Sequence, residues 1–215
     1  MRHRLRAALG TVRRRRQIDR YLAAHPERKL QLGAGGHPVE GWLNTDLHDY
    51  GRPAELVYLD VRKPFPLPDA SFDFVYSEHM LEHLTYDEGQ RCLRECLRVL
   101  RPGGTIRIAT PSLERIAGLY DAGDLEARYV RWAVETLDPE VDAPLPGVVV
   151  NNFFHSWGHR FVYDPQTLRH ALRQAGFVDI EERPVGELEH HLAEAPEFNE
   201  YETVVLEGRR PPQAP

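Results

Sequence analysis

The chain is poor in cysteine and contains no long apolar run. Cys92 and Cys96 are its only cysteines, and they lie four residues apart in a stretch with helical periodicity. Two cysteines supply neither a disulfide framework nor a complete structural zinc site. We therefore interpret both as reduced residues on or near a buried helix face. No apolar run reaches the roughly 20 residues that a membrane-spanning helix requires, so membrane insertion is not expected.

Broadly distributed positive charge is also missing. Residues 1–20 have a net charge of +7, whereas the remainder of the chain has −13. Nucleic-acid-binding domains usually present a wide basic surface, so no nucleic-acid partner is expected. The Arg13–Arg16 run could contact an anionic surface, but a solvated helix face or a flexible end is the favoured interpretation. The arginine-rich start lacks the apolar segment of a secretory signal, which favours a cytoplasmic protein.

The residues that are present suit one α/β domain. Apolar residues make up 41% of the 215-residue chain, which is enough for a substantial core. We predict a basic helix within 1–26, a domain over 27–208 with an insertion at about 112–162, and a flexible tail at 209–215. A connection as long as this insertion is often a lid or a binding loop.

Strands and helices are predicted to alternate along the chain. Helices are expected at 2–24, at Tyr86–Leu100, in two short pieces within 113–136 that are split near Gly123, and from the Asp164 N-cap to Ala175. Strands are expected at Lys29–Leu32, Trp42–Asp46, Leu56–Asp60, Ser71–Ser77, Thr105–Thr110, Phe177–Arg183 and Tyr201–Glu207. This order predicts a doubly wound, mostly parallel seven-stranded sheet of Rossmann-like type. Its last strand is expected to be antiparallel, and its site to lie above the carboxyl strand ends.

The glycine-rich turn after the first strand is the strongest local signal. Gly33, Gly35 and Gly36 remove side chains where a bound molecule could lie against backbone N–H groups. Only residues 33–41 separate the first two strands, so the crossover helix is expected to shrink to about one turn. Asp46, which ends the second strand, could accept hydrogen bonds from the hydroxyls of a ribose. The pairing predicts a nucleoside-containing cofactor.

Five segments together resemble one protein family. The segments are Leu32–Gly36, Asp46, Asp60, Ser71–Ser77 and Arg98–Gly104. At these spacings the chain resembles the class I S-adenosylmethionine-dependent methyltransferases, closely over Lys29–Pro111 and loosely over the last two strands. Within that family it looks most like the small enzymes of carbohydrate and natural-product pathways. The resemblance implies S-adenosylmethionine as the cofactor and a small-molecule acceptor.

The resemblance also implies a set of cofactor-binding positions. They lie in the glycine-rich turn, at the ends of the second and third strands, and after the fourth strand. The turn would face the methionyl part, the two strand ends would hold the ribose and the adenine edge, and the last position would border the methyl donor. In chain order, the positions are Gly33, Ala34 and Gly35, then Asp46 and Leu47, then Asp60 and Val61, and finally Ser77 and Glu78.

Histidines are the candidates for acid–base chemistry. Methyl transfer to a hydroxyl requires that the acceptor be aligned with the methyl carbon and that a proton be removed. Histidine titrates near neutral pH and suits this task. His83 is the first candidate for the base and His79 the second, because they lie four residues apart after the fourth strand, on one face of an expected helix. A packing or capping role is the alternative for both.

A second histidine cluster lies in the insertion. The segment Asn151–Phe161 combines His155 and His159 with an arginine and four aromatic residues. Aromatic faces with polar groups suit sugars or flat rings, so we predict that this loop covers the acceptor and that both histidines are further catalytic candidates. A hydrophobic plug under a long loop is the alternative. The favoured function is O-methylation of a sugar or natural-product hydroxyl, with N-methylation of a small molecule as the alternative.

Other functions compete with this interpretation. Residues His79–His83 spell H-x-x-E-H, a zinc hydrolase signature, but spacing identifies no third protein ligand and nothing else in the sequence requires a metal. A nicotinamide oxidoreductase is disfavoured, because Pro38 stands where a glycine is expected and Asp46 follows Gly33 by 13 residues instead of about 20. A non-catalytic cofactor-binding protein would show the same cofactor motifs. No oligomeric state is predicted.

Overall fold

The computed structural model describes residues 2–52, 54–121, 123–186, 198 and 201–213, with side chains from Arg13 onward. Met1 and the last two residues of the predicted tail lie outside this description. The strands are β1 (Lys29–Leu32), β2 (Leu43–Asp46), β3 (Leu56–Tyr58), β4 (Phe72–Glu78), β5 (Leu100–Pro111), β6 (Val178–Glu182) and β7 (Thr203–Arg209). The helices are α1 (Arg2–Ala24), α2 (Tyr86–Val99), α3 (Leu113–Ala117), α4 (Asp124–Leu137), α5 (Pro146–His155) and α6 (Pro165–Ala175), with 3-10 turns η1 (Leu81–His83) and η2 (Gly118–Tyr120).

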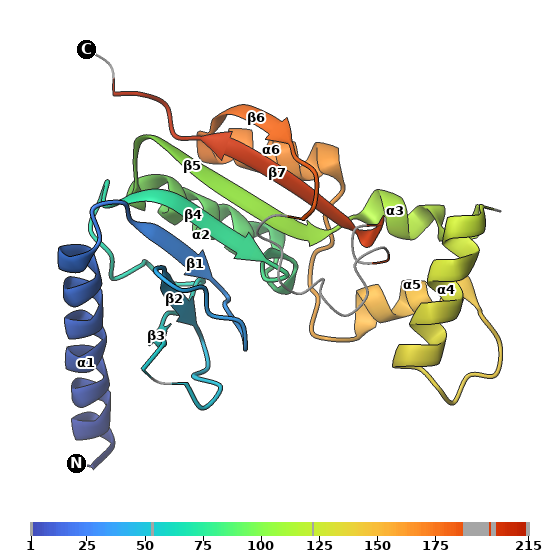
Figure 1. Cartoon of the computed structure of the whole chain (residues 1–215), viewed down its shortest axis with the longest axis horizontal. Coiled ribbons are helices and arrows are strands. Elements are labelled where there is room, and N and C mark those ends of the chain that lie inside the picture. Colours follow the sequence, from blue (N-terminus) through green and yellow to red (C-terminus); the bar gives the residue numbers. More distant parts are fainter. Residues whose placement is uncertain (1, 53, 122, 187–197, 199–200, 214–215) are drawn as a thin grey trace.

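The strands form one seven-stranded sheet in the order β3-β2-β1-β4-β5-β7-β6 (Figure 1). Strands β3, β2, β1, β4 and β5 pair in parallel, and β7 is antiparallel to both β5 and β6. The predicted fold class is confirmed, including the antiparallel last strand. Because the strand order reverses between β1 and β4, the carboxyl ends of these strands border the crevice where open α/β sheets bind ligands.

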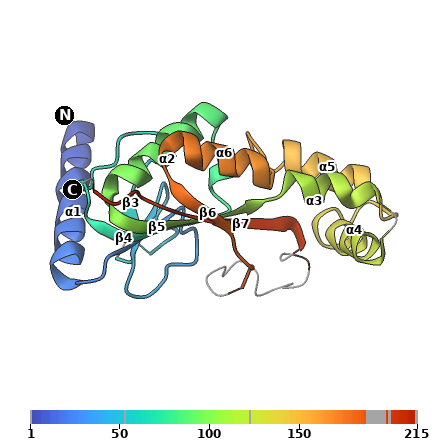
Figure 2. The same ribbon diagram turned by 90° about the horizontal axis from the view of Figure 1, so that it is seen from above.

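Local capping signals position the two helices that pack on one face of the sheet (Figure 2). Thr85 is the N-cap of helix α2. Its hydroxyl accepts a hydrogen bond from the Glu88 N–H, and the Glu88 carboxylate accepts one from the Thr85 N–H. Helix α6 begins after Asp164 and ends at Gly176, which adopts a φ of +108°. Both predicted helices are therefore confirmed. The two cysteines on α2 are buried and unpaired, as expected.

The link between β1 and β2 differs from the prediction. It contains turns but no helical turn along its length, which the structure describes in full. Trp42 packs edge-on against Phe74 and Tyr76 of β4, with ring centroids 5.6 and 6.1 Å apart. The Asn44 side chain bonds both the N–H and the carbonyl of Val39 at 2.9 Å. The Trp42 indole thus packs on the sheet where the shortened helix was predicted, and the Asn44 amide fixes the link beside it.

The C-terminal strand extends into the predicted tail. Strand β7 continues to Arg209, and the Arg210 N–H donates to the Gly104 carbonyl at 2.9 Å. The Arg210 guanidinium donates to the carbonyls of Leu97 and Arg98 at 3.1 and 3.0 Å, at the end of α2. The start of the predicted flexible tail is therefore fixed against the sheet, because its backbone and side chain satisfy otherwise unpaired carbonyls.

The insertion is mostly helical and has a core of its own. The predicted split near Gly123 is confirmed, since α3 ends before it and α4 begins after it. The second half was predicted as a loop, yet Pro146–His155 forms α5, because Pro146 is tolerated in a first helical turn and Val149 and Phe153 share a buried face. Helices α3, α4 and α5 gather at the end of the sheet opposite α1 (Figure 1). The buried residues of this second core are Ile116, Leu119, Tyr129, Val130, Ala133, Val134, Val149, Phe153, Val162 and Tyr201.

Helix α1 forms as predicted and is anchored through its C-terminal end. Tyr21 stacks near Phe72, and its hydroxyl donates to the Lys29 carbonyl and accepts from the Lys29 N–H, both at 2.8 Å. The start of β1 is thereby fixed. Among the described helices, none combines the length and the apolar character that crossing a membrane would need.

Candidate functional site

Two adjoining cavities open at the carboxyl edge of the sheet. The first, which we call the turn cavity, has a volume of about 560 Å³ and is bordered by the glycine-rich turn and the ends of β2 and β3. The second, the insertion cavity, has a volume of about 360 Å³ and lies against α4 and α5. His79, His83 and Trp157 line both cavities. The two spaces therefore meet at these three side chains.

Asp46 ends β2 and faces the glycine-rich turn. Its Oδ2 accepts a hydrogen bond from the Gly35 N–H at 2.9 Å, and its Oδ1 accepts one from the His48 N–H at 2.8 Å. Each carboxylate oxygen retains a further lone-pair direction, and the side chain lines the turn cavity. The carboxylate is thus held in place and can still accept two hydroxyl donors.

Gly33 lets the turn lie directly against the segment that follows β4. Its φ is +66°, and a Cβ at this position would lie 2.4 Å from Met80 Cγ. Met80 in turn lines the turn cavity. Only glycine therefore fits here without moving the cavity wall.

We expect Gly33→Ala to lower the free energy of unfolding by about 2–4 kcal/mol. Alanine would have to adopt a left-handed backbone conformation and would overlap Met80. Urea denaturation followed by circular dichroism measures the effect. Gly36→Ala is the matched control, because a Cβ there meets no atom within 4 Å and its φ is ordinary. Equal losses in the two variants would contradict this account.

The Asp60 carboxylate is occupied by two basic neighbours. Arg62 donates from Nε to Oδ1 at 2.8 Å and from Nη2 to Oδ2 at 3.1 Å, and Lys63 Nζ lies 3.4 Å from Oδ2. The hydrogen bond to Arg62 is the main reason that the pKa of Asp60 is lowered to about 2. An adenine amino group would therefore compete with Arg62 and Lys63 for this carboxylate. Asp60 and Val61 both line the turn cavity.

The Asp60–Arg62 pair predicts an acid-sensitive contribution to stability. The pKa in the folded state lies below the ordinary value of 3.8, so the pair stabilises the protein above about pH 4 and this contribution is lost as the pH falls towards 2. The Arg62 side chain is 46% exposed, so we expect about 1 kcal/mol or less.

Arg62→Gln should therefore lower the free energy of unfolding at pH 7 and have a smaller effect at pH 3, as measured by urea denaturation. Arg52→Gln is the control, because Arg52 forms a surface pair with Glu55 and is remote from Asp60 in sequence. An Arg62→Gln effect that is the same at both pH values would refute the assignment.

The structure brings most, but not all, of the predicted cofactor positions together. The predicted residues that line the turn cavity are Gly33, Gly35, Asp46, Leu47, Asp60 and Val61. Ala34, Ser77 and Glu78 are buried and do not belong to this lining. The Ala34 N–H instead donates to the Thr45 carbonyl at 3.0 Å and ties the turn to β2. Arg62, Met80 and Trp157 line the cavity without having been predicted to do so.

The segment after β4 does not form the predicted helix face. Only the 3-10 turn η1 forms, and His79 adopts a φ of +44°. His79 Nδ1 lies 3.4 Å from Oε1 of the fully buried Glu82. Burial lowers the pKa of His79, but the hydrogen bond and charge of Glu82 outweigh it and raise this pKa to about 9. His79 therefore offsets the buried charge of Glu82, while His83 faces a different partner.

That partner is His159 of the insertion. The Arg160 and Phe161 N–H groups both donate to the Glu82 carbonyl, at 2.8 and 3.1 Å, and so bring the end of the insertion beside η1. The rings of His83 and His159 lie 5.0 Å apart in an edge-to-face arrangement. Burial lowers the pKa of His159, which favours a neutral imidazole. Two histidines that are distant in sequence thus meet at the junction of the cavities.

His155, the remaining predicted catalytic histidine, is not brought to the site. It is exposed at the C-terminal end of α5 and lines neither cavity. The α5 helix explains the difference, since a helix turns His155 away from the face that carries Phe153.

The insertion cavity combines aromatic walls with a polar end. Tyr129 and Trp132 of α4 line it together with Phe153 and Trp157. Glu202, just before β7, also lines it and accepts a hydrogen bond from the Tyr129 hydroxyl. Burial raises the pKa of Glu202. Sequence reasoning missed the α4 residues and Glu202, because helical periodicity shows that a face is buried but not that it borders a cavity.

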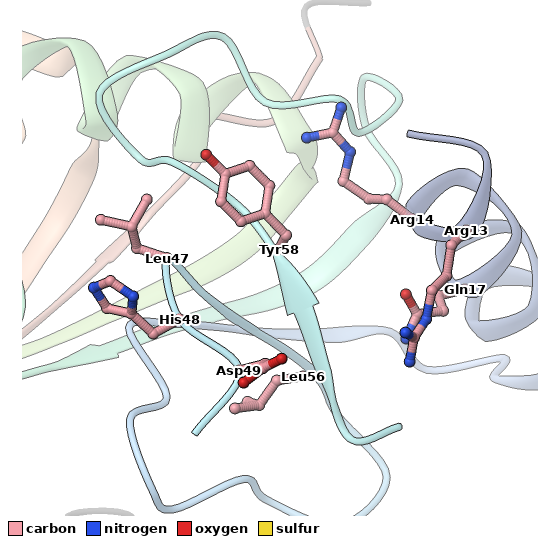
Figure 3. Close-up of a pocket in the computed structure, with 8 residues that line it drawn as sticks. All are labelled: Arg13, Arg14, Gln17, Leu47, His48, Asp49, Leu56 and Tyr58. Carbon is pink, nitrogen blue, oxygen red and sulfur yellow. The ribbon is translucent and has the colours of Figure 1, made fainter. Parts of the chain in front are cut away.

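A third hollow lies beside the turn cavity, between α1 and the β2–β3 edge. Figure 3 shows Arg13, Arg14 and Gln17 of α1 facing side chains from β3 and from the segment after β2. Its volume is about 470 Å³, and Arg14 lies over the Tyr58 ring at 5.9 Å. The predicted solvated arginine run is thus exposed at Arg13 but partly packed at Arg14.

Comparison with known proteins finds similarity to methyltransferases over part of the chain. A family profile described as "Methyltransferase domain" matches residues 38–108, from the β1–β2 link into β5. This segment, which is less than half of the chain, is thus similar to methyltransferase domains. The chain is 51% identical over 47 residues to a probable S-adenosylmethionine-dependent methyltransferase of Mycolicibacterium smegmatis, and 49% identical over 47 residues to one of Mycobacterium tuberculosis. Each match covers 22% of the chain, and it spans only 18% and 16% of the respective relatives.

Solved methyltransferase structures share the fold. A methyltransferase from Mesorhizobium loti aligns with a TM-score of 0.53 at 20% identity, over 89% of this chain and 96% of that one. A second, from Archaeoglobus fulgidus, aligns with a TM-score of 0.51 at 16% identity, over 93% of both chains. Both sequence relatives are described as S-adenosylmethionine-dependent.

Proposed function

We propose that this chain transfers the methyl group of S-adenosylmethionine to a hydroxyl of a small molecule, with a sugar or another natural product as the acceptor class. The meeting of the two cavities at His79, His83 and Trp157 carries the proposal. A molecule in the turn cavity and one in the insertion cavity would approach each other there. This is the arrangement that direct transfer between two bound molecules requires.

The residues of the turn cavity suit the cofactor. The Asp46 carboxylate keeps one lone-pair direction on each oxygen for the two ribose hydroxyls, while Gly35 and His48 fix its orientation. The cavity volume of about 560 Å³ lies within the range of small-molecule sites. When bound, S-adenosylmethionine supplies an electrophilic methyl group. The chain's own residues bind it, orient it and handle the acceptor proton.

His83 is the residue that we assign to the acceptor proton. Its side chain lines both cavities, and it is not committed to the Glu82 carboxylate as His79 is. A histidine at hydrogen-bond distance from the acceptor can remove the hydroxyl proton as the oxygen is methylated. His79 would help to neutralise the buried acid beside it.

The insertion cavity suits an acceptor with a flat or partly apolar face. Trp132, Phe153 and Trp157 provide aromatic walls, and Glu202 provides a polar end. The carboxylates of Glu82 and Glu202 would also attract an ammonium group, which favours an amine as the second candidate acceptor. Each acid already has a protein partner, in His79 and in the Tyr129 hydroxyl respectively, so we place the hydroxyl first.

A binding and turnover experiment tests the proposal. Calorimetry with S-adenosylhomocysteine should show one site, and product formation should then be followed with a panel of sugars, phenols and amines. Trp132→Ala should raise the acceptor KM by about tenfold and leave the affinity for S-adenosylhomocysteine unchanged, because Trp132 lines only the insertion cavity. Folded protein that binds neither S-adenosylmethionine nor its demethylated product would refute the proposal. If only amines are methylated, the acceptor atom is nitrogen and not a hydroxyl oxygen.

A further inference from the structure

Three side chains at the junction of the cavities form a metal-ligand constellation. One ligand atom from each of Glu82, His83 and His159 lies within 4.8 Å of the others. We propose that these residues bind one divalent transition-metal ion of the zinc class, with an open coordination position facing the cavities. One carboxylate and two imidazoles form a donor set of catalytic zinc sites, in which a fourth position is left for water or substrate. Glu82 and His83 of the H-x-x-E-H pattern supply two of the three ligands. The third ligand is His159 of the insertion and not His79.

The hydrogen bonding of His159 prepares it for this role. Its Nδ1 lies 2.9 Å from the Phe153 carbonyl oxygen, which can only accept. The proton of the neutral ring is therefore assigned to Nδ1, and the Nε2 lone pair is left for a ligand. Histidines that bind metals typically donate their other ring N–H to a carbonyl or carboxylate in this way.

Glu82 supplies a carboxylate that is buried and incompletely satisfied. Its side chain is fully buried, and Oε2 accepts a hydrogen bond from the Thr110 hydroxyl at 3.0 Å. Oε1 faces His79 Nδ1 at the longer distance of 3.4 Å, and no second donor to it is found among the described atoms. Burying an ionised carboxylate is costly unless cations compensate it. A metal ion on this face of Glu82 would add to the compensation that His79 supplies.

The backbone holds the three ligands in fixed relation. Glu82 and His83 are adjacent in η1, and the His83 N–H donates to the Met80 carbonyl at 3.1 Å. The Glu82 carbonyl accepts from the two residues that follow His159, at 2.8 and 3.1 Å. The ligand from the insertion is therefore anchored to the same residue that supplies the carboxylate. This is the preorganisation that a metal site needs.

A bound ion would also have a chemical consequence. Coordination lowers the pKa of a bound hydroxyl, whose proton can then pass to solvent. With the ion present His83 is a ligand, and the ion assumes the activation of the acceptor that we otherwise assign to that histidine. This consequence rests on the proposed function, whereas metal binding itself does not.

Metal binding is tested on untagged, metal-stripped full-length protein without cofactor or acceptor. Titration with Zn²⁺ should show one strong site by calorimetry, and Co²⁺ should give the intense visible absorption of a low-coordinate site. His159→Ala and His83→Ala should each weaken Zn²⁺ binding by at least about tenfold and abolish the Co²⁺ absorption. His155→Ala is the matched control, because His155 is an exposed histidine of the same insertion. Its binding should equal that of the unmodified chain.

The outcomes separate this inference from the proposed function. Zn²⁺ binding that His159→Ala and His83→Ala leave unchanged would show binding to surface histidines only and would overturn the inference. So would the absence of a strong site in protein that binds S-adenosylhomocysteine normally. Protein that binds Zn²⁺ through these residues but not S-adenosylhomocysteine would overturn the proposed function instead. The test substitutes half-buried His159 and not fully buried Glu82, because loss of a buried side chain is more disruptive to folding. Thermal unfolding of each variant verifies that it is folded.

Discussion

Asp46→Ala is expected to weaken the binding of S-adenosylhomocysteine by about 10²–10³-fold. The substitution removes an acceptor for two ribose hydroxyls, and a hydrogen bond to a charged group contributes about 1.5–3 kcal/mol. A loss of about 1.4 kcal/mol corresponds to a factor of ten in affinity. Asp46→Ala also leaves the Gly35 and His48 N–H groups without the carboxylate to which they donate. Isothermal titration calorimetry measures the dissociation constant.

Two further variants make the Asp46 result specific. Asp46→Asn keeps one oxygen acceptor and removes the charge, so its affinity should lie between those of the unmodified chain and Asp46→Ala. Asp49→Ala removes an exposed carboxylate of the same loop, which accepts only from the Gly51 N–H among the hydrogen bonds described, and should leave binding unchanged. If Asp46→Ala folds and binds with unaltered affinity, the turn cavity is not the ribose site.

His83→Ala is expected to lower kcat by about 10²–10⁴-fold while the affinity for S-adenosylhomocysteine changes little. Positioned proton transfer contributes a factor of this size, and His83 lies where the two cavities meet. The rate of S-adenosylhomocysteine formation with the best acceptor of the panel provides the measurement. Metal removal separates the two roles considered for this residue. If the unmodified chain stays active after complete metal removal, His83 acts as the base.

The control for His83 is a histidine far from both cavities. His170→Ala changes an exposed residue of α6 and should preserve turnover. Thermal unfolding should be similar for the two variants, because His83 is only partly buried. A normal kcat in His83→Ala would mean that another group removes the acceptor proton. The assignment of the cofactor site would not be affected.

Local signals in the sequence predicted the elements whose causes are themselves local. Thr85 and Glu88 form the capping box of α2, Asp164 and Gly176 bound α6, and the glycines after β1 form the expected turn. The alternation of these elements was enough to predict the sheet and its antiparallel last strand. The carboxylate of Asp46 lies beside the turn as expected, because neighbouring parallel strands bring their ends to one edge.

The features that the sequence did not predict depend on contacts between distant segments. Arg62 occupies the Asp60 carboxylate, and nothing in strand periodicity indicates which side chain will reach a strand end. His159 lies beside His83 only because two N–H groups of the insertion donate to the Glu82 carbonyl. Trp42 packs on β4 where the short helix between β1 and β2 was predicted, and its position in the sequence does not indicate this contact.

Hydrogen bonds near both ends of the insertion fix it to the rest of the domain. At its start, the Leu113 N–H donates to the Tyr163 carbonyl at 2.7 Å, and at its end Arg160 and Phe161 donate to the Glu82 carbonyl. The intervening residues thus form a cassette between two fixed points, and doubling the length of a flexible loop costs only about 0.6 kcal/mol in closure entropy. Under the proposed function, exchanging this cassette for a shorter or longer one should change the acceptor while the turn cavity keeps its shape.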